Sequence, residues 1–268
     1  MLEIFQYSFM QKALLAGSII AITSALLGVF LILRRMALIG DGFSHIAFGG
    51  IALGLFVGVL PFGVALLFSV AAALCIVKLR EWAKIYGDVS IGIVFSFALA
   101  MGVILISLSN GFSADLHYFL FGNIVSITDE DVAFAATLGT AVFALLVLYN
   151  RELMYISFDE VSARVSGVPV RRLNTLLIVL TAIVVVISIR IVGILLISSF
   201  LIIPPAAALQ VSRSFKGALV LSALFGLVSV VAGLVLSFLF DLASGGAIVM
   251  SAIAIFAASL AYKRIRGG

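Results

Sequence analysis

The chain has 268 residues, of which 64% are hydrophobic and only 10% are charged. A soluble domain carries roughly a quarter charged residues, so this composition excludes an ordinary soluble enzyme and predicts an integral membrane protein. The formal net charge is +4, but Lys and Arg cluster at the ends of apolar runs, which indicates orientation signals and no nucleic-acid partner.

The apolar runs predict an all-α polytopic membrane protein, because a spanning helix needs about 20 mainly apolar residues and no alternating barrel segments are present. The start of the chain lacks the basic segment of a cleavable signal peptide, and we expect residues 1–268 to form a single transmembrane domain. Sharp turns are expected around Pro61 and Gly193. About nine spans are predicted, at residues 13–33, 43–60, 62–79, 90–109, 131–149, 173–189, 193–210, 217–240 and 246–262.

The basic residues predict the orientation of these spans. Only Lys12 and Arg190 fall in one set of connections, and the other 14 of the 16 basic residues fall in the other set. The positive-inside rule then places the N-terminus outside and the C-terminus in the cytoplasm. The 14 residues are Arg34, Arg35, Lys78, Arg80, Lys84, Arg151, Arg164, Arg171, Arg172, Arg213, Lys216, Lys263, Arg264 and Arg266.

The second span carries glycines at positions 50, 54 and 58 on one helix face. Such a stripe of small residues lets two helix backbones approach closely within a membrane. We expect this face to pack inside the subunit, with a dimer interface as the alternative.

Two connections are long enough to fold. The outer one, around residues 110–130, contains Asp115 and His117, which are candidates for contact with an external partner. The inner one spans about residues 150–172 and predicts a short helix from about 159 to 166, with Gly167 at its C-cap. A short amphipathic helix between two spans on the cytoplasmic side is suited to docking another protein.

Few ionisable residues lie near the membrane interior: Asp41, His45, Arg190 and Asp241. Asp41 and His45 are four positions apart, so on a helix they share a face with their Cβ atoms about 6 Å apart. A carboxylate with an imidazole suits a borderline divalent ion such as Zn²⁺, Mn²⁺ or Fe²⁺. The alternatives are a hydrogen-bonded pair that ties two helices together and, for Asp241, an interfacial helix cap.

The motifs H-E-x-x-H, G-x-S-x-G and G-x-x-x-x-G-K-[ST] are absent from the sequence, so any ATP that drives transport would be bound by another chain. A membrane-embedded metalloenzyme would need a third ligand beside Asp41 and His45, for which Asp241 is the only obvious candidate. An ion-coupled secondary transporter is a further alternative, although such proteins commonly show internal repeats and none stands out here.

Five blocks, in order, resemble the permease subunits of bacterial zinc/manganese/iron ABC transporters, the metal-ion ABC-3 permease family. They cover almost the whole chain: "MALIGDGFSHIAFGGIALG", "YFLFGNIVSITDEDV", "DEVSARVSGVPV", "IVGILLISSFLIIPPAAA" and "FDLASGGAIVM". The resemblance implies a multi-pass permease of the cytoplasmic membrane, similar in fold to type II ABC importers. It implies a cytoplasmic ATP-binding subunit, an extracytoplasmic metal-binding protein and a second permease, either an identical copy or a paralogue.

The resemblance also implies roles for particular residues. Asp41, His45 and Asp241 match family positions on the path of the transported metal, with no permanently bound cofactor. Some members have a histidine near the last aspartate, whereas this chain has Ser237 one helical turn before Asp241. The ATPase-docking loop of the family matches the segment that holds Asp159, Glu160, Ser162, Ala163, Arg164 and Gly167, in which residues 162–164 fit a small-residue helix face.

Overall fold

The computed structural model describes residues 7–265 apart from 86, 110–121, 123–126 and 195–196. The described residues form helices joined by short turns and contain no strand. The helices are α1 (Ser8–Leu33), α2 (Ile39–Val57), α3 (Pro61–Ala83), α4 (Gly87–Leu108), α6 (Asp129–Leu148), α7 (Asn150–Phe158), α8 (Glu160–Val165), α9 (Val170–Val192), α10 (Ile197–Val211), α11 (Phe215–Phe240) and α12 (Ser244–Ile265).

Among the described residues, eight helices are long and apolar enough to cross a membrane, which confirms an all-helical, multi-pass architecture. The expected span at 193–210 is instead the 15-residue helix α10. α9 ends at Val192, and its C-cap Gly193 has a φ of +86°, so the expected turn lies at Gly193 while the next helix begins only at Ile197. The turn expected at Pro61 is also present, since this proline opens α3, where its fixed φ suits a first helical position.

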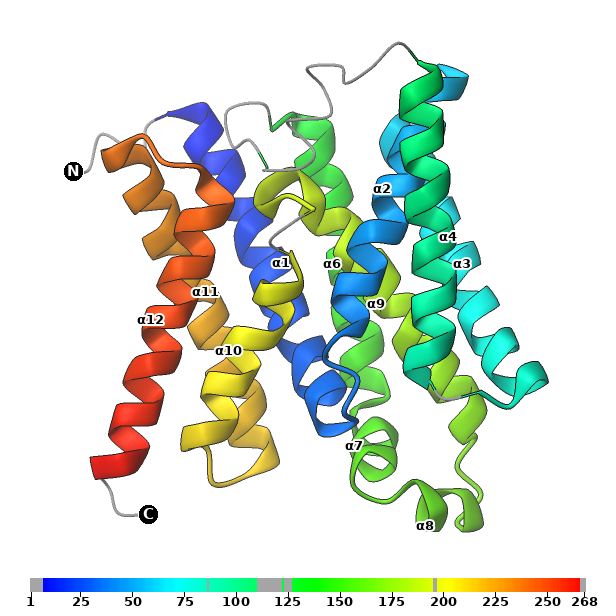
Figure 1. The fold of residues 1–268 in the computed structure, drawn as a ribbon. Helices are drawn as coiled ribbons and strands as arrows, with labels where there is room; N and C mark the ends of the chain where they lie inside the picture. Colours follow the sequence, from blue (N-terminus) through cyan, green and yellow to red (C-terminus); the bar gives the residue numbers. More distant parts are fainter. Residues whose placement is uncertain (1–6, 86, 110–121, 123–126, 195–196, 266–268) are drawn as a thin grey trace.

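The helices form a bundle in which α1, α9 and α10 lie in the middle, α11 and α12 at one side, and α3 and α4 at the other (Figure 1). α1 packs against α6, α9, α10 and α11, whereas α2 packs against α3, α4, α9 and α10. The short helices α7 and α8 lie at one end of the bundle, together with the end of α12 (Figure 1). Among the largest fully buried side chains are Phe30 and Phe43, which belong to one buried apolar cluster, and Phe200, which belongs to a second.

Glycines place α2 in close contact with its neighbours. A Cβ at Gly50 would lie 2.7 Å from the Cα of Ala65, and one at Gly54 would lie 2.6 Å from the Cα of Pro61, both in α3. The expectation of close packing inside the subunit is therefore confirmed for these two glycines. Gly58 differs, because it ends α2 in the left-handed conformation with open space beside it.

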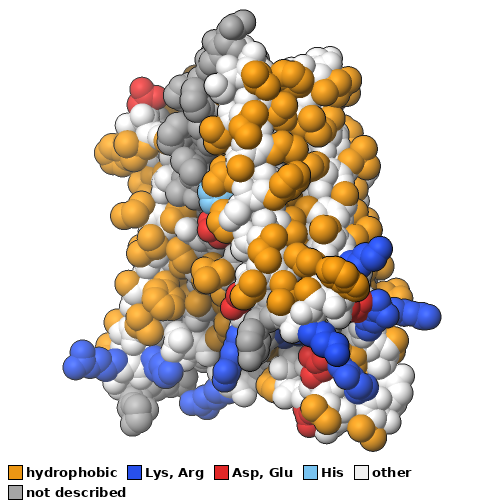
Figure 2. All heavy atoms as spheres, turned by 45° about the vertical axis from the view of Figure 1, so that its right-hand side comes forward, with side chains coloured by type: hydrophobic (Ala, Val, Ile, Leu, Met, Phe, Trp, Pro, Cys, Tyr) orange, Lys and Arg blue, Asp and Glu red, His pale blue; other side chains and the backbone are white. Residues whose placement is uncertain are grey.

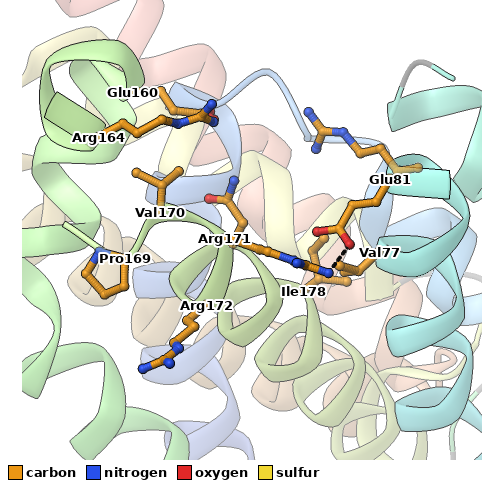
Figure 3. Close-up of a pocket in the computed structure, with 11 residues that line it drawn as sticks. Val77, Glu81, Glu160, Arg164, Pro169, Val170, Arg171, Arg172 and Ile178 are labelled. Atoms are coloured by element: carbon orange, nitrogen blue, oxygen red, sulfur yellow. Dashed lines mark hydrogen bonds and ion pairs between the residues drawn. The ribbon is translucent and has the colours of Figure 1, made fainter. Parts of the chain in front are cut away.

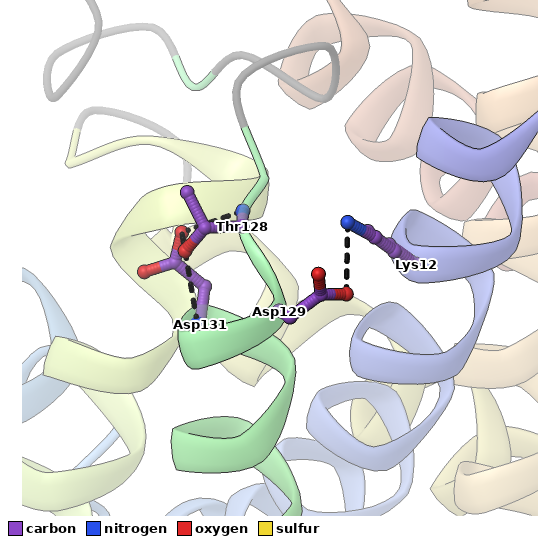
Figure 4. A network of polar contacts seen from close by, with 4 residues as sticks. All are labelled: Lys12, Thr128, Asp129 and Asp131. Carbon is purple, nitrogen blue, oxygen red and sulfur yellow. Dashed lines mark hydrogen bonds and ion pairs between the residues drawn. The ribbon is translucent and has the colours of Figure 1, made fainter.

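The two ends of the bundle differ in charge. Figure 2 shows basic side chains gathered at the lower end of one face, below a band of apolar side chains. At the other end Lys12 of α1 forms a 2.8 Å ion pair with Asp129, the first residue of α6 (Figure 4). A capping box between Thr128 and Asp131 starts α6 beside this pair. Lys12 thus has a local partner that accounts for a basic residue at this end.

Candidate functional site

Asp41 and His45 lie together on the first turns of α2. The Nε2 atom of His45 is 3.9 Å from Oδ1 of Asp41, too long for a hydrogen bond but close enough for both atoms to reach one ion. The imidazole lies against the ring of Phe95 in α4, with 5.4 Å between ring centroids. The i, i+4 spacing in the sequence therefore brings the two donor groups to one face.

Glycines let side chains of neighbouring helices pack tightly against this helix turn. A Cβ at Gly40 would lie 2.9 Å from Cδ1 of Leu201 in α10, and one at Gly42 would lie 2.6 Å from Cγ2 of Ile91 in α4. Figure 1 also shows that α2 begins further from the end of the bundle that holds α7 and α8 than the point where α1 ends. Asp41 is in the first turn of α2, where the helix dipole stabilises a carboxylate.

Both side chains of the pair reach the surface of this single chain. The side chain of Asp41 is 56% exposed and that of His45 is 29% exposed. A carboxylate that faces hydrocarbon is costly, so intramembrane acids face water or other protein groups. The exposed face of the pair therefore fits contact with water or with a second protein chain.

Asp241 lies elsewhere in the fold. It is the C-cap of α11, is exposed and has a φ of +52°. α11 packs against α1, α10 and α12, whereas the pair lies beside α4 and the start of α10. Within the described part of the chain no group of three or more His, Cys, Asp or Glu side chains could hold a metal ion. Asp115 and His117 lie outside the described residues.

The inner loop forms two helices where the sequence predicted one. The predicted helix at about 159–166 is α8, whose N-cap Asp159 accepts a hydrogen bond from the backbone N–H of Ser162. Hydrogen bonds from the Ser162 side chain and backbone lower the pKa of Asp159. Gly167 follows α8 with a φ of +81°, as expected for a residue just past a helix end. The preceding helix α7 was not predicted.

The exposed face of α8 is not the small-residue face expected from the sequence. Ala163 is fully buried in the core of the subunit, because α8 packs back against α7 and α9. Ser162 and Arg164 are exposed, and so are the apolar side chains of Val161 and Val165. A small residue such as Ala163 suits a buried contact within the subunit as well as an exposed docking face. The sequence alone therefore could not tell which of these positions Ala163 occupies.

Glu160 connects α8 to the rest of the subunit. Its carboxylate lies 3.1 Å from the exposed Arg164 and 3.7 Å from Arg34, whose side chain is only 8% exposed. Burial lowers the pKa of Arg34, and the nearby negative charge of Glu160 opposes that shift. Arg34 is the C-cap of α1, seven positions before Asp41. The sequence did not predict this contact of Arg34 with Glu160, since a basic residue after a span is ordinarily an orientation signal.

Comparisons with known proteins agree with this architecture. The model of the ABC 3 transport family matches residues 6–263. The manganese transport system membrane protein MntC of Listeria monocytogenes is 39% identical over 94% of this chain and 90% of its own length. A protein named for iron transport in Haemophilus influenzae is 32% identical over 99% of this chain and 98% of its own length.

Solved structures show the same fold. PsaBC from Streptococcus pneumoniae in complex with Fab superposes with a TM-score of 0.86 at 36% identity, over 96% of this chain and 93% of that chain. An inward-facing ABC transporter of the metal-chelate type superposes with a TM-score of 0.76 at 17% identity, over 97% and 88%.

These relatives are membrane subunits of transport systems, in which ATP hydrolysis belongs to a separate subunit. The alternatives of a metalloenzyme and a secondary transporter are therefore set aside. Its apolar helices and its likeness to these subunits over nearly its whole length show that the chain is a multi-pass protein of the cytoplasmic membrane and belongs to the ABC 3 transport family.

Proposed function

We propose that this chain is the permease subunit of an ATP-driven importer that moves a divalent transition metal ion across the cytoplasmic membrane. The observation that carries the proposal is the exposed pair of Asp41 and His45 on a helix within the membrane-spanning bundle. A carboxylate and an imidazole suit Mn²⁺, Fe²⁺ and Zn²⁺. The names of the relatives favour manganese and iron.

The pair acts as a transient station for the ion. Two protein ligands hold a divalent ion more weakly than the three or four of a catalytic or structural site, and transport requires binding that is also easily reversed. The exposure of both side chains supports a position on a water-filled path, closed on its other side by a second permease, either an identical copy or a paralogue. Asp241 would be a further carboxylate on this path, nearer its outer end.

The cytoplasmic ATPase would dock on α7 and α8, which form the inner loop at about 150–172 of this single permease domain. Exposed apolar side chains on these helices, Phe158, Val161 and Val165, support such a contact. Asp159, Ser162, Arg164 and Gly167 are exposed around them. Buried Ala163 anchors α8 to the subunit, and Glu160 would relay movement of α8 to Arg34 and the start of α2.

An extracytoplasmic metal-binding protein would deliver the ion to the opposite end of the bundle, and the sequence offers Asp115 and His117 as candidate contacts for it. This orientation puts the N-terminus outside and the C-terminus in the cytoplasm, as the distribution of basic residues favours.

The test is metal uptake by the complete transporter, with the permease, its ATPase and its binding protein, reconstituted in liposomes. We expect ATP-dependent accumulation of Mn²⁺ or Fe²⁺, with Zn²⁺ measured in parallel and Mg²⁺ as the hard-cation control. Equal uptake of Mg²⁺, or uptake that does not need ATP, would contradict the proposal.

A further inference from the structure

The ring of Phe95 in α4 lies against the imidazole of His45, with 5.4 Å between the ring centroids and 35° between the ring planes. Phe95 is half-buried and packs against the buried apolar cluster that contains Phe43 and Ile46 of α2. The side chain of His45 is 29% exposed. The contact therefore joins a residue that is anchored in the core of the subunit to one that reaches the surface.

The packing of α4 on α2 fixes this ring contact in place. Four positions of α4 at helical spacing face α2, namely 91, 95, 98 and 102. A Cβ at Gly42 of α2 would lie 2.6 Å from Cγ2 of Ile91. A Cβ at Gly49 would lie 2.5 Å from the backbone oxygen of Ala98. These close approaches, one helical turn before the ring contact and one after it, set the register of the two helices.

No hydrogen bond among the described residues holds the imidazole. A histidine that binds a metal almost always donates its second ring N–H to a carboxylate or a carbonyl, and this bond fixes the orientation of the ring. In the described part of the chain the imidazole of His45 has no such partner, and its Nε2 atom is 3.9 Å from Oδ1 of Asp41, beyond hydrogen-bond distance. The orientation of His45 therefore depends on another contact.

Charged side chains elsewhere in the subunit are held by ion pairs. Figure 3 shows Glu81 of α3 joined to Arg171 of α9 on the wall of a cavity. The pair on α2 has no comparable support, since among the described residues Asp41 forms an ion pair only with His45 itself. The ring of Phe95 is therefore the contact that limits rotation of the imidazole.

We propose that Phe95 is a positioning residue for metal transfer, because its ring holds His45 in the orientation in which Nε2 and the carboxylate of Asp41 bind one ion. This role rests on the proposed function, in which the pair is a station for the ion. Phe95 offers no ligand atom and acts only through His45. Restricting the rotation of the imidazole before the ion arrives lowers the conformational entropy that binding must remove, and so strengthens a site with only two ligands.

The test measures how Mn²⁺ protects His45 in the purified permease–ATPase complex. Diethyl pyrocarbonate modifies neutral imidazoles, and peptide mass spectrometry separates His45 from His117, the only other histidine of the chain. A bound ion occupies the nitrogen that reacts, so the Mn²⁺ concentration that halves the modification rate measures binding at the pair. We expect Mn²⁺ to slow the modification of wild-type His45, and Mg²⁺, the hard-cation control, to have little effect.

Phe95→Leu removes the flat ring but keeps an apolar side chain. It should raise the half-protecting Mn²⁺ concentration about threefold to tenfold, the range that an aromatic ring contact is worth. Phe95→Tyr keeps an aromatic ring and should stay near the wild-type value. The matched control is Phe68→Leu in α3, because Phe68 is also half-buried, packs against the same apolar cluster and lies beside Gly50 of α2. This control should leave the concentration unchanged.

The outcomes distinguish this role from the proposed function. The same half-protecting concentration in wild-type and Phe95→Leu protein would overturn the role of Phe95 and leave the station intact. An equal rise in Phe95→Leu and Phe68→Leu would show a general loosening of α2 and would also overturn it, as would a Phe95→Tyr variant that behaves like Phe95→Leu. A wild-type His45 that Mn²⁺ does not protect would contradict the station itself, and the positioning role with it.

Discussion

The helices α2 and α11 each carry one aspartate that the sequence assigns to the metal path, but they hold it in opposite ways. Asp41 is in the first turn of α2, and His45 follows one turn later on the same face. Asp241 is the C-cap of α11, in the left-handed conformation. The positive end of a helix dipole stabilises a carboxylate and the negative end destabilises one. Asp41 therefore has a second potential metal ligand beside it at the favourable end of its helix, whereas Asp241 lies at the unfavourable end of α11 and forms no ion pair among the described residues.

The largest expected effect is at the preformed site. Asp41→Asn and His45→Ala should each abolish ATP-dependent metal uptake in the reconstituted transporter, because one remaining ligand cannot replace the water shell of the ion. Expression and assembly with the ATPase should stay near normal, since both side chains are partly exposed and lie too far apart for a hydrogen bond to each other. Wild-type uptake by His45→Ala would show that the station is not at this pair.

The next largest expected effect is on stability, and it tests whether close backbone contacts hold α2, the helix of Asp41 and His45, in place. A Cβ at Gly49 of α2 would lie 2.5 Å from the carbonyl oxygen of Ala98 in α4, whereas one at Gly92 of α4 meets nothing within 4 Å. Gly49→Ala should therefore destabilise the protein by about 1–3 kcal/mol, and Gly92→Ala should change stability by less than about 1 kcal/mol. Thermal unfolding in detergent measures both, and equal melting temperatures would contradict the close packing of α2.

The position of the Asp41–His45 pair could be predicted from the sequence, whereas the close contact of α2 with α4 could not. Runs of apolar residues place the helices because each must match the thickness of the hydrocarbon layer. The i, i+4 spacing then fixes the geometry of Asp41 and His45. The short α10, the inward direction of Ala163 and the contact of Arg34 with Glu160 depend on how helices distant in sequence pack. Hydrophobicity and local spacing do not contain that information.

A smaller effect concerns the link between α8 and α2. Glu160→Gln removes the negative charge beside the buried Arg34 and should lower stability by about 1 kcal/mol, less than for a fully buried pair because the Glu160 side chain is 39% exposed. It should also reduce the stimulation of ATPase activity by metal-loaded binding protein severalfold. The control Glu81→Gln removes the same charge from an exposed ion pair with Arg171, outside the proposed docking surface, and should have little effect on either quantity. An equal loss in both variants would show that Arg34 has no special part in coupling.

The smallest expected effect is a change in stability that has opposite signs when each of the two aspartates is replaced by asparagine. Asp41→Asn removes a negative charge from the first turn of α2 and should lower stability by about 0.3–1 kcal/mol, whereas Asp241→Asn removes one from the end of α11 and should raise stability by a similar amount. Asparagine tolerates the left-handed conformation of residue 241, so the substitution isolates the charge. Melting temperatures measured at low ionic strength should move in opposite directions, and added salt should reduce both shifts because it screens the helix dipole. Shifts of the same sign would mean that local contacts, and not the helix ends, decide how each carboxylate is held.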